Sequence, residues 1–455
     1  MRLFNLFVAV FLLFSGATDA QDKSDVWSLE RCVRFAIDHN ISIKQDSLNA
    51  RLARYTMLQS QLSQLPNASV NGSYGRSFGR SINPTTNQFV DASYNFVSAS
   101  GNGSLLLFGW MQIRNTIAKN KYALDASLAD LDQLKDDVSL NVANSFLNAL
   151  LQEEQITISR HQVELSKAQL DQTRAFAESG RLPELNVAQL ESQLATDSSN
   201  LINSISNYNS ALLDLKTLLN LDFNVPFDIQ IPDMAVGEQM MIARLQPDEI
   251  YQKAHSHFGA IKGAELRVRS GEKGLAAAKG SLYPQLSLGY QPGTNFASSY
   301  QEVTYINGQP VYKDIPFGTQ FNSNFRQSVY LNVNVPIFNG WLSQYAVREA
   351  KINLATQELN EYNAELTLKQ NVYKAHNNAM NSIQKYSAAR RADEAAARAL
   401  DFAKKRYDLG LTSTVDLLVT QNSQFAAAAN LVSAKYDLIF KLKVIDYYLG
   451  KELKL

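Results

Sequence analysis

The chain has 455 residues, a length that suits two or three domains. Its 43 lysines and arginines balance its 43 aspartates and glutamates, so it has no basic field that would hold nucleic acid. Five scattered histidines and one cysteine exclude a disulfide framework and a cysteine-rich metal site, and we expect no cofactor.

The N-terminus has the pattern of a secretory signal peptide over residues 1–20. A positive residue is followed by an apolar run, and a small residue precedes the predicted cut at Gln21. An N-terminal membrane anchor is the alternative, but the apolar run is shorter than the ~20 residues that a helical span needs. Cys32 follows two charged residues rather than small apolar ones, so we expect it in a helix and not as a lipid acceptor.

The first half of the mature chain begins with a helical pattern at residues 27–64, which Pro66 ends. The period then changes to two and predicts strands at about residues 68–78 and 93–108. Each strand exceeds the roughly 9–11 residues that a tilted membrane strand needs. No later run resembles a transmembrane helix, so any membrane contact beyond the signal is predicted to come from strands.

An uninterrupted helical pattern follows from Trp110 to Glu178. Its apolar residues recur at intervals of seven, which indicates coiled-coil packing. They include Ile117, Leu124, Leu131 and Val138. Gly180 is expected to end this helix in the left-handed conformation, and a return helix from about Val187 keeps the same spacing.

The second half repeats the first after a proline-containing stretch at residues 221–246, which we interpret as an irregular linker with room for one short strand or helix. A helix is predicted at 247–282, and strands at about 286–291 and 330–337 flank a polar loop. A second long helix then leads to Gly410.

Gly410 follows Gly180 by 230 residues, and apolar residues of the two return helices keep the same offset. Agreement at so many points indicates an internal duplication. The predicted organisation is a first repeat at residues 21–220, the linker, and a second repeat at 247–455. Each repeat consists of a helix, two strands and a long helical hairpin.

Four strands cannot close a barrel by themselves, and open strand edges are not tolerated in lipid. Closure needs at least eight strands, so the sequence predicts an oligomer. A dimer would supply eight strands around a filled interior, whereas a trimer would supply twelve around a lumen.

Several motifs recur in the same order in both halves. Residues 107–110 read Leu-Phe-Gly-Trp and residues 337–341 read Ile-Phe-Asn-Gly-Trp. The first helical segment opens with Trp-Ser-Leu-Glu-Arg-Cys-Val at 27–33, and Arg-Tyr-x-x-Gly stands at 406–410. Over essentially the whole mature chain this pattern resembles the TolC-like outer-membrane efflux protein family. The resemblance implies a mixed α and β membrane fold, in which duplicated coiled-coil helical hairpins form a periplasmic α-barrel and four strands per chain join a trimeric 12-stranded transmembrane β-barrel.

The resemblance also implies a function and its partners. The chain would be the passive exit duct of a tripartite efflux or type I secretion system in the outer membrane of a Gram-negative cell, extending into the periplasm. Its partners would be two further copies of itself, the lipid of the outer membrane, a periplasmic adaptor (membrane fusion) protein and an inner-membrane transporter. Drug, metal and protein export share this architecture, so the exported cargo stays open.

The resemblance assigns roles to residues at the two hairpin tips. Tyr407 matches the tyrosine that closes the gate in the family, and Asp416 matches one acid of the constriction. Three other family residues are replaced here. The acid that pairs with the gate tyrosine is Asn186, the basic latch residue is Thr412, and the second acid of the ring is Val419. The latch is therefore less ionic than in the family. The expected adaptor-docking residues are Gly180, Arg181, Leu182, Pro183, Gly410, Leu411 and Ser413.

Simpler interpretations of the same residues remain open. Asp416 could instead act only as a negative charge at the N-terminus of a helix, for which Thr412 or Ser413 is the expected N-cap. Tyr407 could instead only fill space in the coiled coil. Pro183 is expected as the first residue of the other return helix.

Two other classes of protein are alternatives to a channel. An enzyme is disfavoured because no nucleophile elbow, phosphate loop or zinc-spaced ligand set is present, and because His255 and His257 would not face together on a helix. A periplasmic coiled-coil adaptor or scaffold protein without a membrane barrel would explain the seven-residue spacing of the apolar residues, but not the four long strands.

Overall fold

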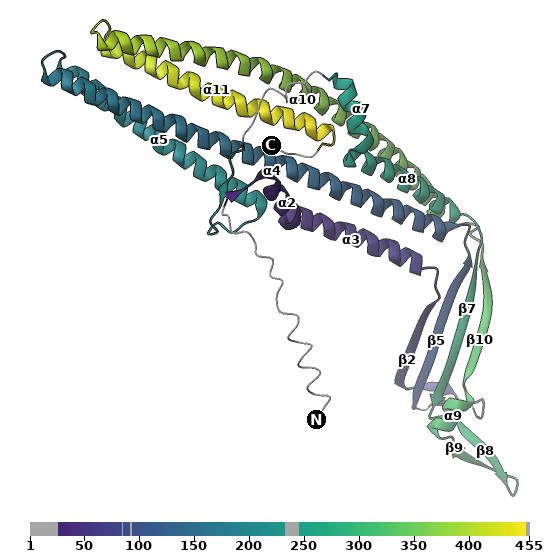
Figure 1. The fold of residues 1–455 in the computed structure, drawn as a ribbon. Helices are drawn as coiled ribbons and strands as arrows, with labels where there is room; N and C mark the ends of the chain where they lie inside the picture. Colours follow the sequence, from purple (N-terminus) through teal and green to yellow (C-terminus); the bar gives the residue numbers. More distant parts are fainter. Residues whose placement is uncertain (1–25, 84, 92, 233–244, 452–455) are drawn as a thin grey trace, which may run out of the picture. The chain divides into compact units, whose positions relative to one another are not determined.

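The computed structural model describes residues 26–83, 85–91, 93–232 and 245–451 (Figure 1). The signal peptide predicted at residues 1–20, with its cut at Gln21, lies outside this part of the chain. Among the described helices, none combines the length and the hydropathy that a bilayer crossing requires.

Long antiparallel helices and one four-stranded sheet make up most of the described chain (Figure 1). The helices are α2 (Leu29–His39), α3 (Ile41–Leu62), α4 (Gln112–Glu178), α5 (Glu184–Leu219), α7 (Pro247–His257), α8 (Gly259–Gly280), α9 (Phe317–Ser323), α10 (Leu342–Asp408) and α11 (Thr414–Tyr448). The strands are β1 (Val26–Trp27), β2 (Asn67–Ser77), β3 (Arg80–Ile82), β4 (Phe89–Asp91), β5 (Tyr94–Phe108), β6 (Asp228–Ile229), β7 (Gln285–Ala297), β8 (Gln301–Ile306), β9 (Gln309–Asp314) and β10 (Arg326–Asn334).

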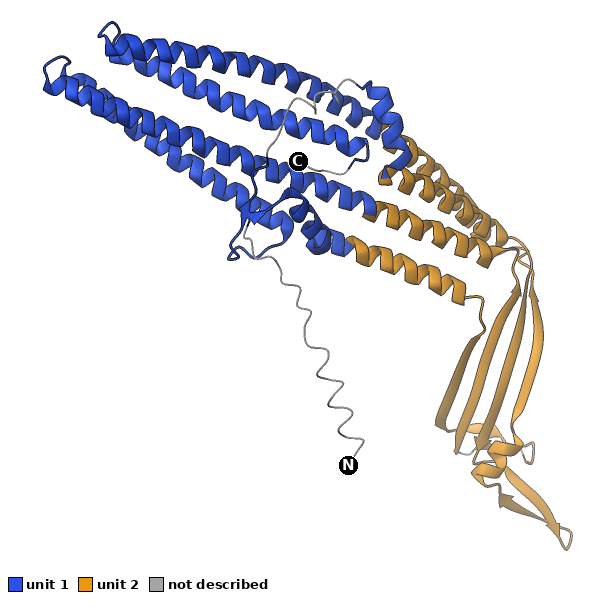
Figure 2. Ribbon diagram, viewed as in Figure 1, with its two compact units in different colours: residues 1–45, 132–258, 367–455 blue, residues 46–131, 259–366 orange. Residues whose placement is uncertain are grey.

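The chain divides into two compact units, each built from several segments (Figure 2). Unit 1 comprises residues 1–45, 132–258 and 367–455, and unit 2 comprises residues 46–131 and 259–366. The helices α4 and α10 run through both units, and each spans roughly 100 Å at ~1.5 Å per residue. The predicted repeats at 21–220 and 247–455 are defined by similarity between the two halves of the sequence, and not by compactness. Their boundaries therefore stay a prediction.

Unit 1 is helical, and its core lies between the long hairpin helices and α7. Large side chains with almost no exposed surface form this core, as expected for the apolar positions of packed helices. They are Phe146, Leu150, Leu190, Leu215, Leu219, Ile250, Leu417, Leu438, Ile439, Leu442 and Ile445.

The helix predicted at residues 27–64 is wrong in one respect, because Asn40 divides it into α2 and α3. The Asn40 side chain accepts hydrogen bonds from the backbone N–H groups of Ser42 (2.9 Å) and Ile43 (3.4 Å), and so caps α3. Trp27 lies in β1, which pairs in parallel with β6, a short strand within the predicted linker. The helix predicted at 247–282 is also divided, at Phe258, where the backbone turns to an extended conformation.

Unit 2 carries the antiparallel sheet, whose strand order is β10-β7-β5-β2. The four strands predicted from alternation are therefore present. The last one ends at Asn334, earlier than predicted. Pro336 lacks a backbone N–H and cannot donate to a strand ladder, which explains the early end.

Two small hairpins, β3–β4 and β8–β9, were not predicted. The polar loop expected around residues 306–310 is the turn of the second hairpin, where Asn307 (φ 53°) and Gly308 (φ 77°) both take the left-handed conformation. Their strands have only three to six residues, too few for a period of two to be distinguished from chance.

Candidate functional site

The two hairpin tips have the same backbone structure, 230 residues apart. Gly180 (φ 73°) ends α4 and Gly410 (φ 69°) ends α10, as predicted. In each tip the residue after the glycine donates its N–H to a carbonyl five residues earlier: Arg181 to Phe176 and Leu411 to Arg406, both at 2.8 Å. These bonds satisfy carbonyls that a helix end leaves unpaired, so each tip is a tight and well-bonded turn.

The return helices begin differently at the two tips. Ser413 is the N-cap of α11, and its hydroxyl accepts the N–H of Asp416 (3.1 Å) and donates to the Asp416 carboxylate (2.7 Å). Pro183 is the N-cap of α5, so the prediction that it is the first helical residue is wrong by one position. Its φ of −70° and ψ of 152° are extended, and α5 begins at Glu184.

Asp416 is exposed, in the first turn of α11. The hydrogen bonds from Ser413 hold the pKa of the Asp416 carboxyl below its usual value, and Thr412 contributes in the same direction. This carboxylate therefore stays ionised at neutral pH. The structure thus brings Thr412, Ser413 and Asp416 together at the second tip.

Tyr407 is buried between the two hairpins, with 5% of its surface exposed. It packs on Leu400 and Leu417, and Leu165 and Leu182 of the first hairpin border the same cluster. Leu182, expected at the docking surface, is therefore partly buried.

The hydroxyl of Tyr407 links the two hairpins within one chain. It lies 2.8 Å from the hydroxyl of Thr173 in α4 and 3.3 Å from that of Thr414 in α11. Within the chain its partner in the first hairpin is therefore Thr173. The bond from Tyr407 to Asn186 of a neighbouring hairpin, which the resemblance implies, stays a prediction. Asn186 is half-buried in the first turn of α5, where its N–H bonds to Pro183.

A row of buried polar side chains on α4 leads from the middle of the hairpin to Thr173. We call it the polar seam: Ser159, Gln162, Ser166, Gln169 and Thr173. Their spacing of three and four residues puts them on one face of the helix.

The polar seam contacts both α5 and α11. The buried carboxylate of Asp197 in α5 accepts hydrogen bonds from Ser166 (2.5 Å) and Gln162 (3.3 Å). Gln421 in α11 donates to Ser166 (2.9 Å). Among the described residues, neither amide atom of Gln169 has a hydrogen-bond partner, and the amide oxygen of Gln421 has none. Sequence reasoning missed these residues because it followed only apolar residues.

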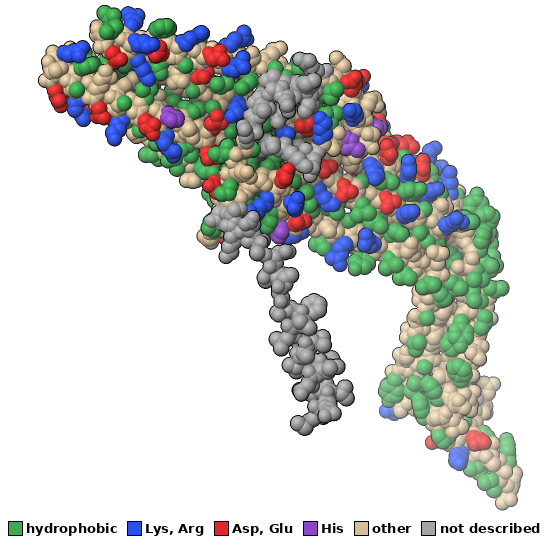
Figure 3. Space-filling model, viewed as in Figure 1, with side chains coloured by type: hydrophobic (Ala, Val, Ile, Leu, Met, Phe, Trp, Pro, Cys, Tyr) green, Lys and Arg blue, Asp and Glu red, His purple; other side chains and the backbone are tan. Residues whose placement is uncertain are grey.

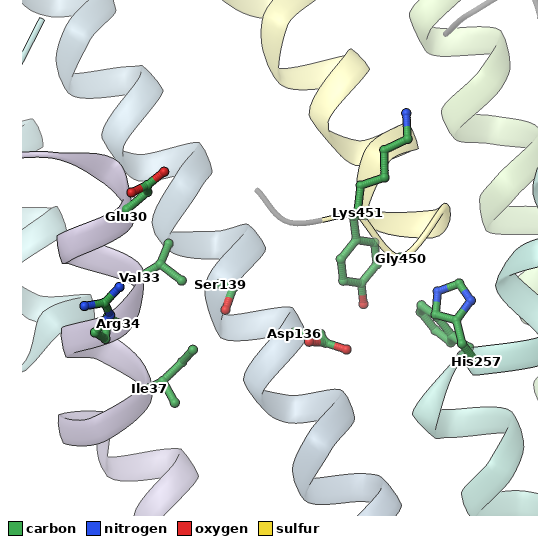
Figure 4. Close-up of a pocket in the computed structure, with 11 residues that line it drawn as sticks. Glu30, Val33, Arg34, Ile37, Asp136, Ser139, His257, Gly450 and Lys451 are labelled. Carbon is green, nitrogen blue, oxygen red and sulfur yellow. The ribbon is translucent and has the colours of Figure 1, made fainter. Parts of the chain in front are cut away.

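A cavity of about 500 Å³ lies in unit 1 between α2, α4, α7 and the end of α11 (Figure 4). Charged side chains line it, including Arg34, Asp136 and Lys451, and His257 lies beside them. Burial raises the pKa of the Asp136 carboxyl, and neighbouring acids add to the effect. No group of three or more metal-ligating side chains occurs in the described part of the chain.

The sheet has one polar and one apolar face, as its strand register shows. Along β2, β5, β7 and β10 the only charged residues are Arg76 and Arg326. On the side drawn in Figure 3, charged side chains gather over the helices and are nearly absent from the sheet.

The polar face carries hydroxyl and carboxamide groups. They include those of Asn67, Ser69, Asn71, Ser73, Ser98, Ser100, Asn102, Ser104, Ser287, Gln291, Asn295, Ser328 and Asn332. The side chains of Phe96, Tyr330 and Arg326 lie on the same face. The apolar face carries Val70, Tyr74, Val97, Leu105, Leu286, Leu288, Tyr290, Phe296, Val329, Leu331 and Val333.

The sequence is similar to those of known outer membrane proteins. The family model described as "Outer membrane efflux protein" matches residues 33–221 and 250–450. The chain is 21% identical over 311 residues to the outer membrane protein TolC of Salmonella enteritidis, a match that covers 68% of this chain and 60% of that protein. It is 22% identical to the outer membrane efflux protein BepC of Brucella suis, covering 73% of this chain and 68% of the relative.

Solved structures share the fold at low identity. The Campylobacter jejuni CmeC outer membrane channel superposes with a TM-score of 0.75 at 19% identity, covering 93% of this chain and 85% of that one. The open state of the Neisseria gonorrhoeae MtrE outer membrane channel gives a TM-score of 0.72 at 17% identity, covering 94% and 89%. The mixed helical and stranded fold class predicted from the sequence is confirmed.

Proposed function

Since the chain belongs to the outer membrane efflux protein family, a family of efflux proteins and not of enzymes, we propose that it is the exit duct of a tripartite efflux or type I secretion system. In this proposal three copies form a passive channel through the outer membrane and the periplasm. A periplasmic adaptor and an inner-membrane transporter open it at the hairpin tips, and the transporter sets the cargo.

The observation that carries the proposal is the pair of open edges of the sheet. Within the described chain, β2 and β10 each pair on one side only. Three antiparallel steps separate them, so β2 and β10 run in opposite directions, and β10 of one copy can continue the antiparallel pattern with β2 of the next. Three copies then supply twelve strands, an even number as in single-chain outer-membrane barrels.

The two faces of the sheet fit the two sides of such a barrel. The apolar face suits contact with lipid, and the polar face, whose one charged residue is Arg326, suits a water-filled lumen. In lipid each unpaired backbone group costs several kcal/mol, so edge pairing between copies and membrane insertion favour one another.

The hairpin tips of unit 1 supply the periplasmic end in this proposal. The docking surface consists of Gly180, Arg181, Leu182, Pro183, Gly410, Leu411 and Ser413. Three copies of Asp416 would form a ring of carboxylates at the mouth, which attracts cations. Tyr407 holds the second hairpin to the first through Thr173. In this proposal Asn186 and Thr412 are further residues of the gate. Secretion through a signal peptide cut near Gln21 completes the route to the outer membrane.

Reconstitution of the purified mature protein into planar bilayers tests the proposal. We expect stepwise single-channel currents, small in the resting state because the tips are closed. The alternative, a periplasmic scaffold protein without a membrane barrel, predicts a protein that stays soluble without detergent and carries no current. Co-purification from membranes would identify the adaptor and the transporter.

A further inference from the structure

Two aromatic side chains on the polar face of the sheet cover a glycine of the adjacent strand. Tyr330 of β10 lies directly opposite Gly289 of β7. A Cβ atom built at Gly289 would lie 2.4 Å from Cζ, 2.6 Å from Cε2 and 2.8 Å from the hydroxyl oxygen of Tyr330. The ring therefore occupies the space that any other residue at position 289 would need.

The second pair has the same geometry in another part of the sheet. Phe96 of β5 lies opposite Gly75 of β2. A Cβ atom at Gly75 would lie 2.6 Å and 2.8 Å from ring atoms of Phe96. These glycines have no positive φ, so their backbone conformation does not require glycine. The contact with the aromatic ring is therefore what requires glycine at positions 75 and 289.

A third glycine of the polar face provides the contrast. Gly293 lies in β7, four residues after Gly289, and faces no aromatic ring. The nearest atom to a Cβ built there is the carbonyl oxygen of Ala99, at 3.6 Å, which is an ordinary contact. An alanine thus fits at 293 without movement, whereas at 289 or 75 the ring must move.

The ring has one direction in which to move. Carbon atoms in contact are normally about 3.5–4.0 Å apart, so a methyl group at 289 would displace the Tyr330 ring by more than 1 Å. The sheet backbone lies on one side of the ring, and the polar face is open on the other. Tyr330, already half exposed, would rise from the sheet into the space in front of it.

We propose that Gly289 and Gly75 are seats that hold Tyr330 and Phe96 flat against the channel wall and thereby set its free bore. The inference rests on the proposed function, since the polar face is the lumen wall only if the chain forms the channel. Around a trimer each seat occurs three times, so one glycine controls three rings at one level. Tyr330 and Phe96 would present ring faces, and not ring edges, to passing cargo.

Thiol labelling at Ser287 measures passage past the Tyr330 level. Ser287 lies on the polar face, two residues from Gly289 and nearer to the helices, since Gln285 begins β7 directly after α8. A membrane-impermeant maleimide–polyethylene glycol added from the extracellular side must pass Tyr330 to reach Ser287→Cys. The native Cys32 is fully buried, which keeps the background low.

We expect Gly289→Ala to slow the labelling of Ser287→Cys several-fold for reagents close to the bore in size. Gly293→Ala, the matched control, should leave the rate unchanged. Gly289→Ala combined with Tyr330→Ser should restore the rate, because no ring is left to lift. Tyr330→Ala alone should change the rate little, because the native ring already lies flat.

Equal labelling rates with glycine and alanine at 289 would overturn the inference. So would a large acceleration by Tyr330→Ala alone, which would mean that the native ring already projects into the bore; this arm holds even if Gly289→Ala fails to assemble. Failure of the proposed function gives a different result: without a membrane barrel no lipid covers the apolar face, so Leu288→Cys on that face is labelled as readily as Ser287→Cys.

Discussion

At the scale of single residues, one hydrogen bond connects the side chain of the gate residue Tyr407 to the first hairpin. Within the described chain, that bond is the one to the hydroxyl of Thr173. A neutral hydrogen bond of this kind contributes about 1 kcal/mol. That is small enough for adaptor binding to offset, and large enough to bias the tip toward its closed state.

Removing the Tyr407 hydroxyl should therefore loosen the tip. We expect Tyr407→Phe and Thr173→Val each to raise the single-channel conductance in planar bilayers, and Tyr362→Phe, at an exposed tyrosine of α10, to leave it unchanged. Asn186→Ala discriminates between the two candidate partners. If Asn186→Ala opens the channel and Thr173→Val does not, the partner in the assembled channel is Asn186, as the resemblance implied.

Asp416 should give the channel mouth its preference for cations. Because hydrogen bonds from Ser413 lower the pKa of Asp416, the carboxylate stays charged as the pH falls through the usual range of an aspartate. Its stabilising contribution is likewise present above the unfolded-state pKa and lost only as the pH falls through the lower folded-state value. Ser413→Ala removes these bonds and should shift the loss of cation preference to a higher pH.

Reversal potentials in a salt gradient, measured against pH, test this expectation. Asp416→Ala should reduce the cation preference at all pH values, and Asp38→Ala, in α2, serves as the charge-matched control. An unchanged selectivity in Asp416→Ala would make Asp416 a helix-capping residue only, and the constriction would then lie elsewhere.

At the scale of elements, the sequence was sufficient for features with a sustained period. The helices α4 and α10 and the four sheet strands follow from apolar residues that recur every seven or every two positions. The break at Asn40 was missed because one side chain causes it, by capping α3, without interrupting the helical period. A local cap of this kind leaves no trace in periodicity.

The polar seam was missed for the opposite reason. Its seven-residue spacing is visible in the sequence, but its residues are polar and were not expected at buried positions. Ser159, Ser166 and Thr173 continue the interval of seven that begins at Ile117. A search for apolar residues stops at Val138, although positions 159, 166 and 173 of the same series are buried. A buried heptad position filled with polar residues is thus a signal that could have identified the seam.

The unpaired amide of Gln169 should weaken this part of the hairpin. A buried polar group without a partner costs about 1–3 kcal/mol, so Gln169→Leu should raise the thermal unfolding midpoint of the detergent-purified protein and reduce its conductance. Gln384→Leu, at an exposed position of α10, is the matched control and should change neither quantity. A lower midpoint in Gln169→Leu would mean that ordered water satisfies the amide, and that the seam is a hydrated interface.

At the scale of the whole molecule, charge and polarity divide between the two kinds of structure. The titratable groups with shifted pKa values all lie in helices, whereas the sheet is nearly free of charge. In the proposed channel, charge at the mouth comes from Asp416 at the hairpin tips, and Arg326 is the one charged residue on the polar face of the sheet strands.

Closure of the barrel by three copies should be visible as disulfide crosslinks between sheet edges. A cysteine on β10, Asn332→Cys, is combined with one on β2, because residues on the same face of paired strands approach closely enough for a disulfide. The β2 positions to scan are Asn67, Ser69, Asn71 and Ser73, which share the polar face. Val70→Cys, on the opposite face, is the control and should not crosslink.

One β2 position should crosslink far better than the others, since a one-residue slip would move every side chain to the other face and the register is therefore fixed. Denaturing gels should then show linear dimers and trimers at partial oxidation, and a single closed trimer at completion, with no larger species. A closed ring consumes all its cysteines, so the ladder stops at the number of copies in the barrel. If the ladder ends at the dimer, the barrel has eight strands. If it extends beyond three copies, the edges pair in an open array, and the channel function proposed here would lose its structural basis.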